Sequence, residues 1–473
     1  MSVPDAVPAS AAPLDPDAQT ASAAASEASS TADLLRRGRL LRVLGVSFGL
    51  AVGLGNTIGA GILRTPGEVA ARLPSTTLYM AVWIAGGVYA LLGAISVAEL
   101  GTMIPKSGGQ YVFARRALGP YAGFVVGWSD WISTAGSCAA VAVVIGEYLA
   151  ALVPALAGWG TGMAIAAILA CAALQWRGVL AAGRAQEATS LLKAVALLGL
   201  VAACFAWSGP RPVAAALPVP SGFPLLIAVV IALQGVIYTY DGWTGVVYFG
   251  GEVADPARDV PRAIFGGVIS IAAIYLLINA ALLHVLPLPA MAGAKLAAGD
   301  AARAVFGARG DTIIRVLLIV ALVSCLNALV LMAPRVLYAI SADGLFTSRA
   351  TIVNRGGTPT VALLASTAVA VVFAATGAFD RIIAVLSFFF VANYVLTFAS
   401  VFVLRRREPD TPRPYRAWGY PWTTGAALVG SLAFLAGAVA GDTRNSLYTL
   451  AVLAASWPVY RLSARLTGGT GAD

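Results

Sequence analysis

Long runs of apolar residues alternate with short polar segments along most of the 473-residue chain. Each run approaches the ~20 residues that an α-helix needs to cross a bilayer whose hydrocarbon core is roughly 30 Å thick. The pattern predicts an all-α polytopic membrane protein with about twelve transmembrane helices. The predicted spans are 43–63, 78–101, 121–153, 163–176, 189–207, 224–250, 264–285, 313–340, 359–375, 382–404, 425–440 and 447–460.

Composition supports a lipid environment. Hydrophobic residues make up 59% of the chain and charged residues only 11%, whereas soluble domains carry about 25% charged residues. The mean hydropathy is +0.83. The lipid bilayer is therefore an expected partner of this chain.

The formal net charge of +9 raises the question of nucleic-acid binding. The positive residues, however, gather in alternate loops, including 36–42 and 405–416. With the N-terminus placed in the cytoplasm, most Lys and Arg residues between the spans also lie on the cytoplasmic side, as the positive-inside rule requires. The charge therefore predicts a multi-pass cell-membrane protein with both termini in the cytoplasm and no nucleic-acid partner.

Residues 1–35 are rich in Ala, Ser, Pro and Asp and contain few large apolar side chains. Such a segment cannot bury enough apolar surface to offset the entropy of ordering, so a disordered cytoplasmic tail is expected. A cleaved signal peptide is not expected, because a basic region followed by an apolar core is missing there.

The first apolar run is interrupted at residues 53–61, Gly-Leu-Gly-Asn-Thr-Ile-Gly-Ala-Gly. Glycine costs about 1 kcal/mol relative to alanine inside a helix. Unpaired backbone groups in hydrocarbon cost several kcal/mol each. An unwound segment at this depth therefore needs a polar partner such as a ligand or a water-filled cavity.

A second interruption, residues 238–245, lies five spans later. Because five is odd, a second five-span unit begins on the opposite side of the membrane, and the two units are inverted relative to each other. Paired interruptions of this kind indicate the binding site of a secondary transporter. We therefore expect inverted repeats at 36–207 and 208–404, followed by two further spans and a short C-terminus at 405–473.

Close helix packing is an alternative explanation for part of the first interruption. Gly45, Gly49 and Gly53 are four residues apart, a spacing that lets helices approach closely. Packing explains the polar pair Asn56 and Thr57 less well. A helix that resumes after the break directs its N-terminal N–H groups and its dipole toward the break, which suits a carboxylate.

Enzyme and metal chemistry find little support. Cys138, Cys171, Cys204 and Cys325 lie singly in apolar segments, and His284 is the single histidine. These residues do not form a metal-ligand pattern, and buried packing is the expected role of the cysteines. A nucleophile elbow and a phosphate-binding loop are also missing from the sequence. The sequence therefore predicts no enzyme activity, no cofactor and no metal site.

Several short motifs follow one another from about residue 40 to residue 421. They are Asn56-Thr-Ile-Gly-Ala-Gly-Ile62 with Thr65-Pro-Gly67, Ile104-Pro-Lys-Ser-Gly-Gly-Gln-Tyr111, Gly127-Trp128 through Glu147-Tyr148-Leu149, Glu252-Val-Ala-Asp-Pro-Ala-Arg-Asp-Val-Pro-Arg262, Pro334-Arg335 with Ala342-Asp-Gly-Leu-Phe346, and Pro412-Arg-Pro-Tyr-Arg416 with Gly419-Tyr-Pro421. In this order and spacing they resemble the amino acid–polyamine–organocation superfamily of permeases, and in particular the L-type amino acid transporters and their bacterial relatives. The resemblance implies a five-plus-five inverted repeat of the leucine-transporter type with two appended helices.

The resemblance implies a site for the α-amino and α-carboxylate groups of an amino acid. The carboxylate is expected on N–H groups around Gly59, Ala60 and Gly61. The α-ammonium is expected on carbonyl groups around Ile58 and in the segment 238–241.

Two aromatic residues of the second interruption also match the family. Tyr238 matches an aromatic gate over the substrate, and Trp243 matches a second aromatic residue nearby. Ordinary apolar packing is the alternative for both.

Asp241 departs from the small residue that the family usually has at this position. An ionisable group in mid-membrane costs about 2.5–3.5 kcal/mol on insertion scales, so it is expected to face a cavity or a partner. One hypothesis is that Asp241 attracts a cationic substrate group or binds a proton. The alternative is that it caps the helix resuming at Gly242.

Lys193 lies roughly 12 Å into the fifth span, at 1.5 Å per residue from Ala185. Its long side chain could snorkel toward the cytoplasmic surface. The resemblance instead implies that its ammonium takes the place of a sodium ion and bridges span 1 to span 8, near Ser324 and Asn327. An ordinary interhelical hydrogen bond is the alternative for Asn327.

The expected function is sodium-independent secondary transport of amino acids by alternating access, as an exchanger or a proton-coupled symporter. An amino acid/polyamine antiporter and a substrate sensor that does not transport are the alternatives. The sequence does not indicate an oligomeric partner. It also leaves the intramembrane acid Asp130 without an assigned role, while Glu99 and Glu147 are expected near the membrane interfaces.

Overall fold

The computed structural model describes residues 40–376, 379–441 and 443–467. The predicted tail at residues 1–35 lies outside them. The described chain is built of helices joined by short connections, and its extended pairing consists of isolated bridges such as Leu44 with Val253. The all-α class is therefore confirmed.

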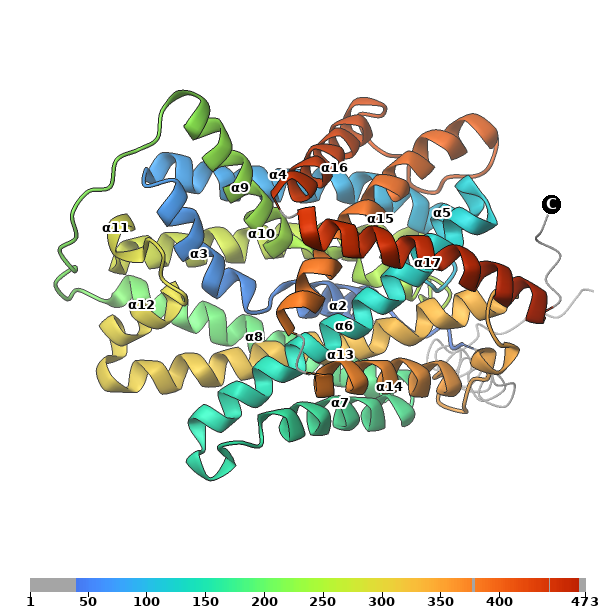
Figure 1. Ribbon diagram of the computed structural model, residues 1–473, viewed down its shortest axis with the longest axis horizontal. Helices are drawn as coiled ribbons and strands as arrows, with labels where there is room; N and C mark the ends of the chain where they lie inside the picture. The colour runs from blue at the N-terminus through green and yellow to red at the C-terminus, as the bar shows by residue number, and fades with distance from the viewer. Residues whose placement is uncertain (1–39, 377–378, 442, 468–473) are drawn as a thin grey trace, which may run out of the picture.

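The helices follow one another along the chain with short 3-10 turns between some of them (Figure 1). The α-helices are α2 Val46–Thr57, α3 Gly61–Arg72, α4 Thr76–Met103, α5 Gln110–Leu118, α6 Pro120–Leu152, α7 Gly160–Trp176, α8 Val179–Ala206, α9 Gly222–Tyr240, α10 Pro256–Val285, α11 Leu288–Met291, α12 Ala297–Phe306, α13 Gly310–Ala342, α14 Thr360–Thr376, α15 Phe379–Arg407, α16 Trp422–Gly441 and α17 Thr443–Thr467. The 3-10 helices are η1 Pro154–Leu156, η2 Trp243–Tyr248, η3 Gly307–Arg309 and η4 Ser348–Thr351.

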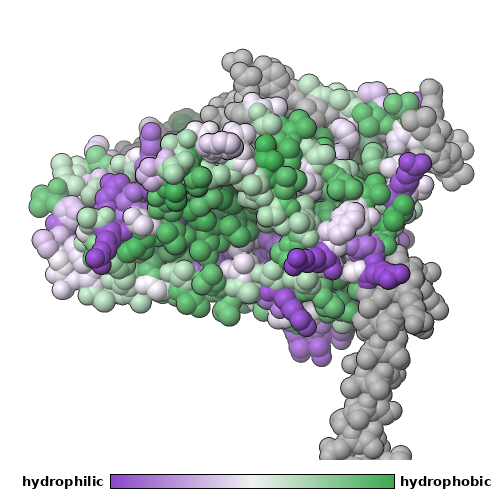
Figure 2. Space-filling model, turned by 90° about the horizontal axis from the view of Figure 1, so that it is seen from below, coloured by the Kyte–Doolittle hydropathy of each residue, from purple (hydrophilic) through white to green (hydrophobic). Residues whose placement is uncertain are grey.

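The described helices fit a multi-pass membrane protein. Eight helical segments are long and apolar enough to cross a bilayer, and the bent pair α2 and α3 makes a ninth. The helices α7 and α14 are also apolar but have only 17 residues each. In Figure 2, a broad apolar area separates hydrophilic residues that gather toward the two ends of the molecule. The count of twelve spans stays a prediction.

Helices occur at every predicted run, but some boundaries differ. The predicted fifth span starts at residue 189, whereas α8 begins at Val179. The ten extra residues include Gln186, whose polar side chain lowers the apolar signal although it is fully buried against α2 and α13. The short helices α5, α11 and α12 connect longer ones and were not predicted.

The two interruptions predicted from the sequence are present. The first helix pair bends by 46° between Thr57 and Gly61. The second break follows Tyr240, after which the chain continues as the 3-10 helix η2. Each broken span thus exposes backbone groups in the middle of the helix bundle.

The two broken spans touch each other at their breaks. The Asn56 side-chain nitrogen donates to the Gly242 carbonyl at 3.3 Å, and the hydroxyls of Thr65 and Thr239 lie 2.9 Å apart. The Tyr275 hydroxyl of α10 donates to the carbonyls of Thr57 and Thr239, at 3.0 and 2.9 Å. Carbonyls freed by the unwinding therefore find partners, as the hydrocarbon environment requires.

Gly242 makes this contact possible. Its φ of +112° lies in a region that favours glycine. A Cβ atom there would also lie 2.9 Å from the Asn56 side chain and from the Thr57 nitrogen.

Ion pairs tie several helices together at one end of the molecule. Arg405 and Arg413 both bind the Glu99 carboxylate at the end of α4, at 2.5 and 3.2 Å. Arg115 of α5 pairs with Asp343 at the end of α13. This end carries the loops that the charge distribution assigns to the cytoplasm.

A further ion pair is completely buried. Arg335 of α13 binds both carboxylate oxygens of Glu252 at 3.0 Å, and neither side chain is exposed. The Ser107 hydroxyl also donates to Glu252, and the Gly108 N–H donates to the Tyr248 carbonyl. These contacts join three parts of the chain: helix α13, the loop that follows α4, and the segment that follows η2.

Candidate functional site

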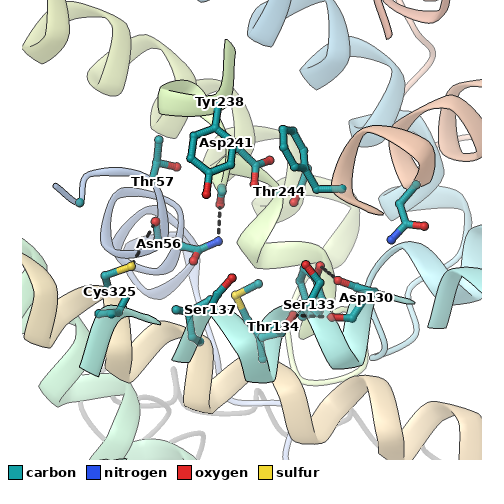
Figure 3. Close-up of a pocket in the computed structure, with 18 of the residues that line it drawn as sticks. Asn56, Thr57, Asp130, Ser133, Thr134, Ser137, Tyr238, Asp241, Thr244 and Cys325 are labelled. Carbon is teal, nitrogen blue, oxygen red and sulfur yellow. Dashed lines mark hydrogen bonds between the residues drawn. The ribbon is translucent and has the colours of Figure 1, made fainter. Parts of the chain in front are cut away.

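A cavity of about 210 Å³ lies where the two breaks meet (Figure 3). It is smaller than the roughly 300–1,000 Å³ of pockets for drug-sized ligands, so it suits a small molecule. Helices α2, α3, α5, α6, α9, α13 and α15 and the 3-10 helix η2 contribute to its wall. The lining residues are Asn56, Thr57, Gly59, Gly61, Gln110, Asp130, Ser133, Thr134, Ser137, Val141, Tyr238, Thr239, Asp241, Gly242, Thr244, Tyr248, Cys325, Leu329, Met332, Phe390, Asn393 and Tyr394.

The start of α3 opens onto this cavity. Gly59 and Gly61 line it, and Ala60 is the residue that precedes the helix. The first N–H groups of an α-helix lack partners inside the helix and carry the positive end of its dipole. A Cβ atom at Gly59 would meet nothing within 4 Å. The Gly59 N–H itself donates to the Thr57 carbonyl at 3.0 Å, so a small anionic group would have to use the N–H groups that follow it at the start of α3.

Ile58 occupies a different position from its neighbours. Its side chain is fully buried, and its carbonyl oxygen accepts a hydrogen bond from the Lys193 ammonium at 2.7 Å. The carbonyl that was expected to receive a substrate ammonium thus already has a cationic partner.

The two aromatic residues of the second break face different surroundings. Tyr238 lines the cavity, is 42% exposed and packs against Phe390, with ring centroids 5.6 Å apart. Trp243 is buried and stacks on Tyr394 behind the lining residues. Tyr238 is thus placed where it can cover a ligand, whereas Trp243 supports the wall.

Asp241 is the residue at which α9 ends, and Gly242 precedes η2. One carboxylate oxygen of Asp241 accepts a hydrogen bond from the Tyr394 hydroxyl at 2.7 Å. The carboxylate lines the cavity. The side chain can therefore attract a cationic group in the space between the two breaks.

Lys193 lies outside the cavity and points to the first break. Its Nζ atom donates to the carbonyls of Gly55 and Ile58 in span 1 and to that of Ala321 in α13, at 2.9, 2.7 and 3.4 Å. The side chain is 1% exposed. Three carbonyl oxygens around one cation resemble the oxygen environment that hard metal cations prefer.

Ser324 and Asn327 of α13 form a neighbouring polar network. The Ser190 and Ser324 hydroxyls lie 3.1 Å apart, and the Asn327 side chain donates to Gln186 at 2.7 Å. Gln186 and Ser190 also donate to the Ala51 carbonyl of α2. This network adds a second link between spans 1, 5 and 8, and the sequence analysis did not include Gln186 or Ser190.

The sequence analysis also missed the polar face of α6. Asp130, Ser133, Thr134 and Ser137 all line the cavity, across from Asp241 and Tyr238. Their spacing places them on one face of the helix. Polar residues at this helical spacing in an otherwise apolar span were a signal in the sequence from which the polar face of α6 could have been predicted.

Metal binding finds no support in the described part of the chain. Groups of three or more His, Cys, Asp or Glu side chains that could hold a metal ion are missing among the described residues. The four cysteines are unpaired thiols.

Comparison with known proteins decides the family. A family model described as amino acid permease matches residues 39–457. The chain belongs to the amino acid permease family. This match agrees with the resemblance stated from the motifs of the sequence.

Named relatives of this permease are transporters. The serine/threonine exchanger SteT of Bacillus subtilis is 30% identical over 429 residues, which cover 89% of this chain and 96% of the relative. The large neutral amino acids transporter small subunit 2 of Mus musculus is 27% identical, covering 80% of this chain and 73% of the relative. The b(0,+)-type amino acid transporter 1 of Oryctolagus cuniculus is 26% identical, covering 80% and 79%. The permease is a membrane transport protein of amino acids rather than an enzyme.

Proposed function

We propose that this permease carries out sodium-independent secondary transport of amino acids by alternating access. The cavity at the meeting of the two breaks carries the proposal, because it combines donors for a carboxylate with acceptors for a cation. In the proposed binding mode, the α-carboxylate lies at the start of α3, near Gly59 and Gly61. The α-ammonium lies beside the break after α9, near Asp241, and Tyr238 covers the bound amino acid.

The proposed mechanism includes an inverted repeat. We propose that residues 36–207 and 208–404 form two inverted units and that both termini lie in the cytoplasm. The contacts between α2, α3, α9 and η2 place the two breaks side by side, as expected where two such units meet. Rocking of one unit against the other would then expose the same cavity to either side.

Sodium independence is supported by the Lys193 ammonium. It already binds the carbonyls of Gly55, Ile58 and Ala321, so a sodium ion at this position would have to displace a charged lysine. A covalently attached cation can hold span 1 against span 8 without an external ion.

Exchange is the proposed mode of transport, and the similarity to an exchanger over nearly the whole chain supports it. The test uses the purified full-length permease in proteoliposomes. Uptake of labelled serine and threonine is measured with either unlabelled serine or buffer inside, and with external sodium replaced by choline. Uptake that needs internal amino acid and is unchanged in choline supports sodium-independent exchange.

Other outcomes of this experiment favour other functions. Uptake into buffer-loaded vesicles that rises with an inward proton gradient indicates proton symport. Sodium-dependent uptake contradicts the proposed role of Lys193. Amino acid binding without flux, shown by a shift in thermal stability, indicates a sensor.

A further inference from the structure

The polar face of α6 faces the cavity from the side opposite the second break (Figure 3). The binding mode proposed above uses the start of α3 and the end of α9 and leaves this face free for the side chain of the bound amino acid. Asp130 is the charged residue on this face.

Asp130 is buried but only partly hydrogen-bonded. The side chain is 8% exposed, and its Oδ1 atom accepts a hydrogen bond from the Tyr248 hydroxyl at 2.9 Å. Its Oδ2 atom is buried without a hydrogen-bond partner. An unsatisfied carboxyl oxygen at this depth is costly, and a donor group carried by a bound ligand would satisfy it.

Two unsatisfied polar atoms belong to residues that line the cavity. Among the described side chains, five buried polar atoms lack a partner, and two of them, Asp130 Oδ2 and Thr57 Oγ1, belong to residues that line this cavity. Asp130 lies on α6, whereas Thr57 lies at the first break. The packing of a single helix therefore does not explain both unsatisfied atoms.

The charges around the cavity are one-sided. Asp130 and Asp241 contribute two carboxyl groups, whereas Lys, Arg and His are missing from its described lining. Lys193 directs its ammonium to the carbonyls of Gly55 and Ile58 and does not line the cavity. A carboxyl group inside a membrane pairs with a cation or stays neutral. One α-ammonium can balance one of the two carboxylates and leaves the other for a second positive group.

We propose that Asp130, together with the hydroxyl face of α6, forms a subsite for a cationic side chain and that this permease accepts amino acids with a second ammonium group. The proposal rests on the transport function proposed above. In it, the α-ammonium lies near Asp241, and the side-chain ammonium donates to Asp130 Oδ2. Ser133, Thr134 and Ser137 supply neighbouring oxygen atoms on the same helix face.

The test compares two amino acids that differ mainly in charge, L-lysine and L-norleucine, which has no terminal ammonium. Competition with labelled serine uptake is measured for the unmodified permease and for Asp130→Asn in proteoliposomes. Asp130→Asn keeps the shape of the side chain and removes its charge. We expect lysine to compete at least tenfold better than norleucine in the unmodified protein. We expect the substitution to weaken lysine at least tenfold and norleucine less than threefold.

Two controls separate this subsite from general damage. Glu147→Gln makes the same kind of change on α6 at an exposed position outside the cavity, and it should alter neither competitor. Tyr248→Phe removes the hydrogen bond to Asp130 but keeps the carboxylate, so lysine should remain preferred over norleucine.

If Asp130→Asn does not fold, the preference for lysine can be tested by ligand binding to the unmodified protein, without a transport measurement. Lysine should then raise the thermal stability of the unmodified protein in detergent more than norleucine does at equal concentration. The proposal is overturned if lysine is not preferred by the unmodified protein, or if Asp130→Asn weakens both competitors equally. Serine flux without any lysine preference overturns the subsite alone, whereas absence of amino acid flux contradicts the transport function itself.

Discussion

At the scale of single residues, the first break depends on one basic side chain, Lys193, whose partners are backbone atoms. The Lys193 ammonium binds three carbonyl oxygens, two of which are freed by the unwinding of span 1. The Lys193 side chain therefore links the two sides of this break to α13. In the proposed binding mode, N–H groups at the start of α3 receive the carboxylate of the substrate.

Lys193→Ala should reduce amino acid uptake at least tenfold while membrane insertion persists. The substitution removes the cation between span 1 and α13, whereas loss of a membrane lysine eases insertion. Initial uptake rates in proteoliposomes, normalised to the amount of inserted protein, test this expectation. Lys193→Arg, which keeps a positive charge, is the matched control. An alanine variant that transports at the parental rate would contradict the assigned role.

At the scale of helices, the important element is the crossing of the two broken spans. Gly242→Ala should destabilise this crossing, because φ is +112° and a Cβ atom would lie 2.9 Å from Thr57 N. Backbone strain of this kind costs of order 1–3 kcal/mol. Gly199→Ala in α8, where a Cβ atom meets nothing within 4 Å, should be neutral or slightly stabilising. Thermal unfolding of both variants in detergent measures the difference.

The sequence carries strong signals for the helices and for the breaks. Glycine and polar residues in hydrocarbon are costly, so their presence at 53–61 and 238–245 predicted where the chain unwinds. The family resemblance identified Gly59, Gly61 and Tyr238, which line the cavity. These features depend on local sequence and could be predicted.

Other features depend on which helices become neighbours. Asp130 was seen as intramembrane but had no predicted partner, because Tyr248 lies 118 residues away and on another span. Gln186 lies outside the predicted fifth span, because its burial is apparent only once α2 and α13 pack against α8. Trp243 matches an aromatic position of the family, yet only the packing of α15 shows that it stacks behind the cavity wall.

At the scale of the whole molecule, the ends of many helices are held together on one side. The Glu252–Arg335 ion pair is the most deeply buried of these links, and Arg335 also lies over the Phe249 ring at 4.8 Å. These contacts close the bundle between the cavity and the predicted cytoplasmic end.

Glu252→Gln should destabilise the fold by about 3–5 kcal/mol, because it leaves the buried Arg335 guanidinium uncompensated. The double variant Glu252→Gln with Arg335→Met should lose less, since the unpaired charge is then removed. Thermal unfolding of the purified variants provides the measurement, and equal stability of all three proteins would contradict the expectation.

The control for this ion pair is Glu408→Gln, which removes a partly exposed pair with Arg116. Such surface pairs contribute about 1 kcal/mol or less. Hydrogen bonding from Arg116 lowers the pKa of Glu408, so this pair stabilises the fold at neutral pH and is lost as the pH falls through the lowered pKa.

The charge distribution predicts the orientation of the whole molecule in the membrane. An epitope tag at either terminus should be accessible to antibodies only after the membrane is permeabilised, because both termini are predicted to be cytoplasmic. Cleavage of the N-terminal tail by protease added to intact cells would overturn this topology.

The position of one cysteine, Cys325, allows the proposed alternating access to be tested by chemical labelling. The Cys325 thiol lines the cavity and donates to the Asn56 carbonyl at 3.5 Å, whereas Cys138 and Cys204 are buried elsewhere in the bundle. A membrane-impermeant alkylating reagent can reach Cys325 only from the side to which the cavity is open. Labelling from each side in turn, in a variant whose other three cysteines are replaced by serine, would record the opening and closing of the permease. Bound amino acid should slow the alkylation from both sides.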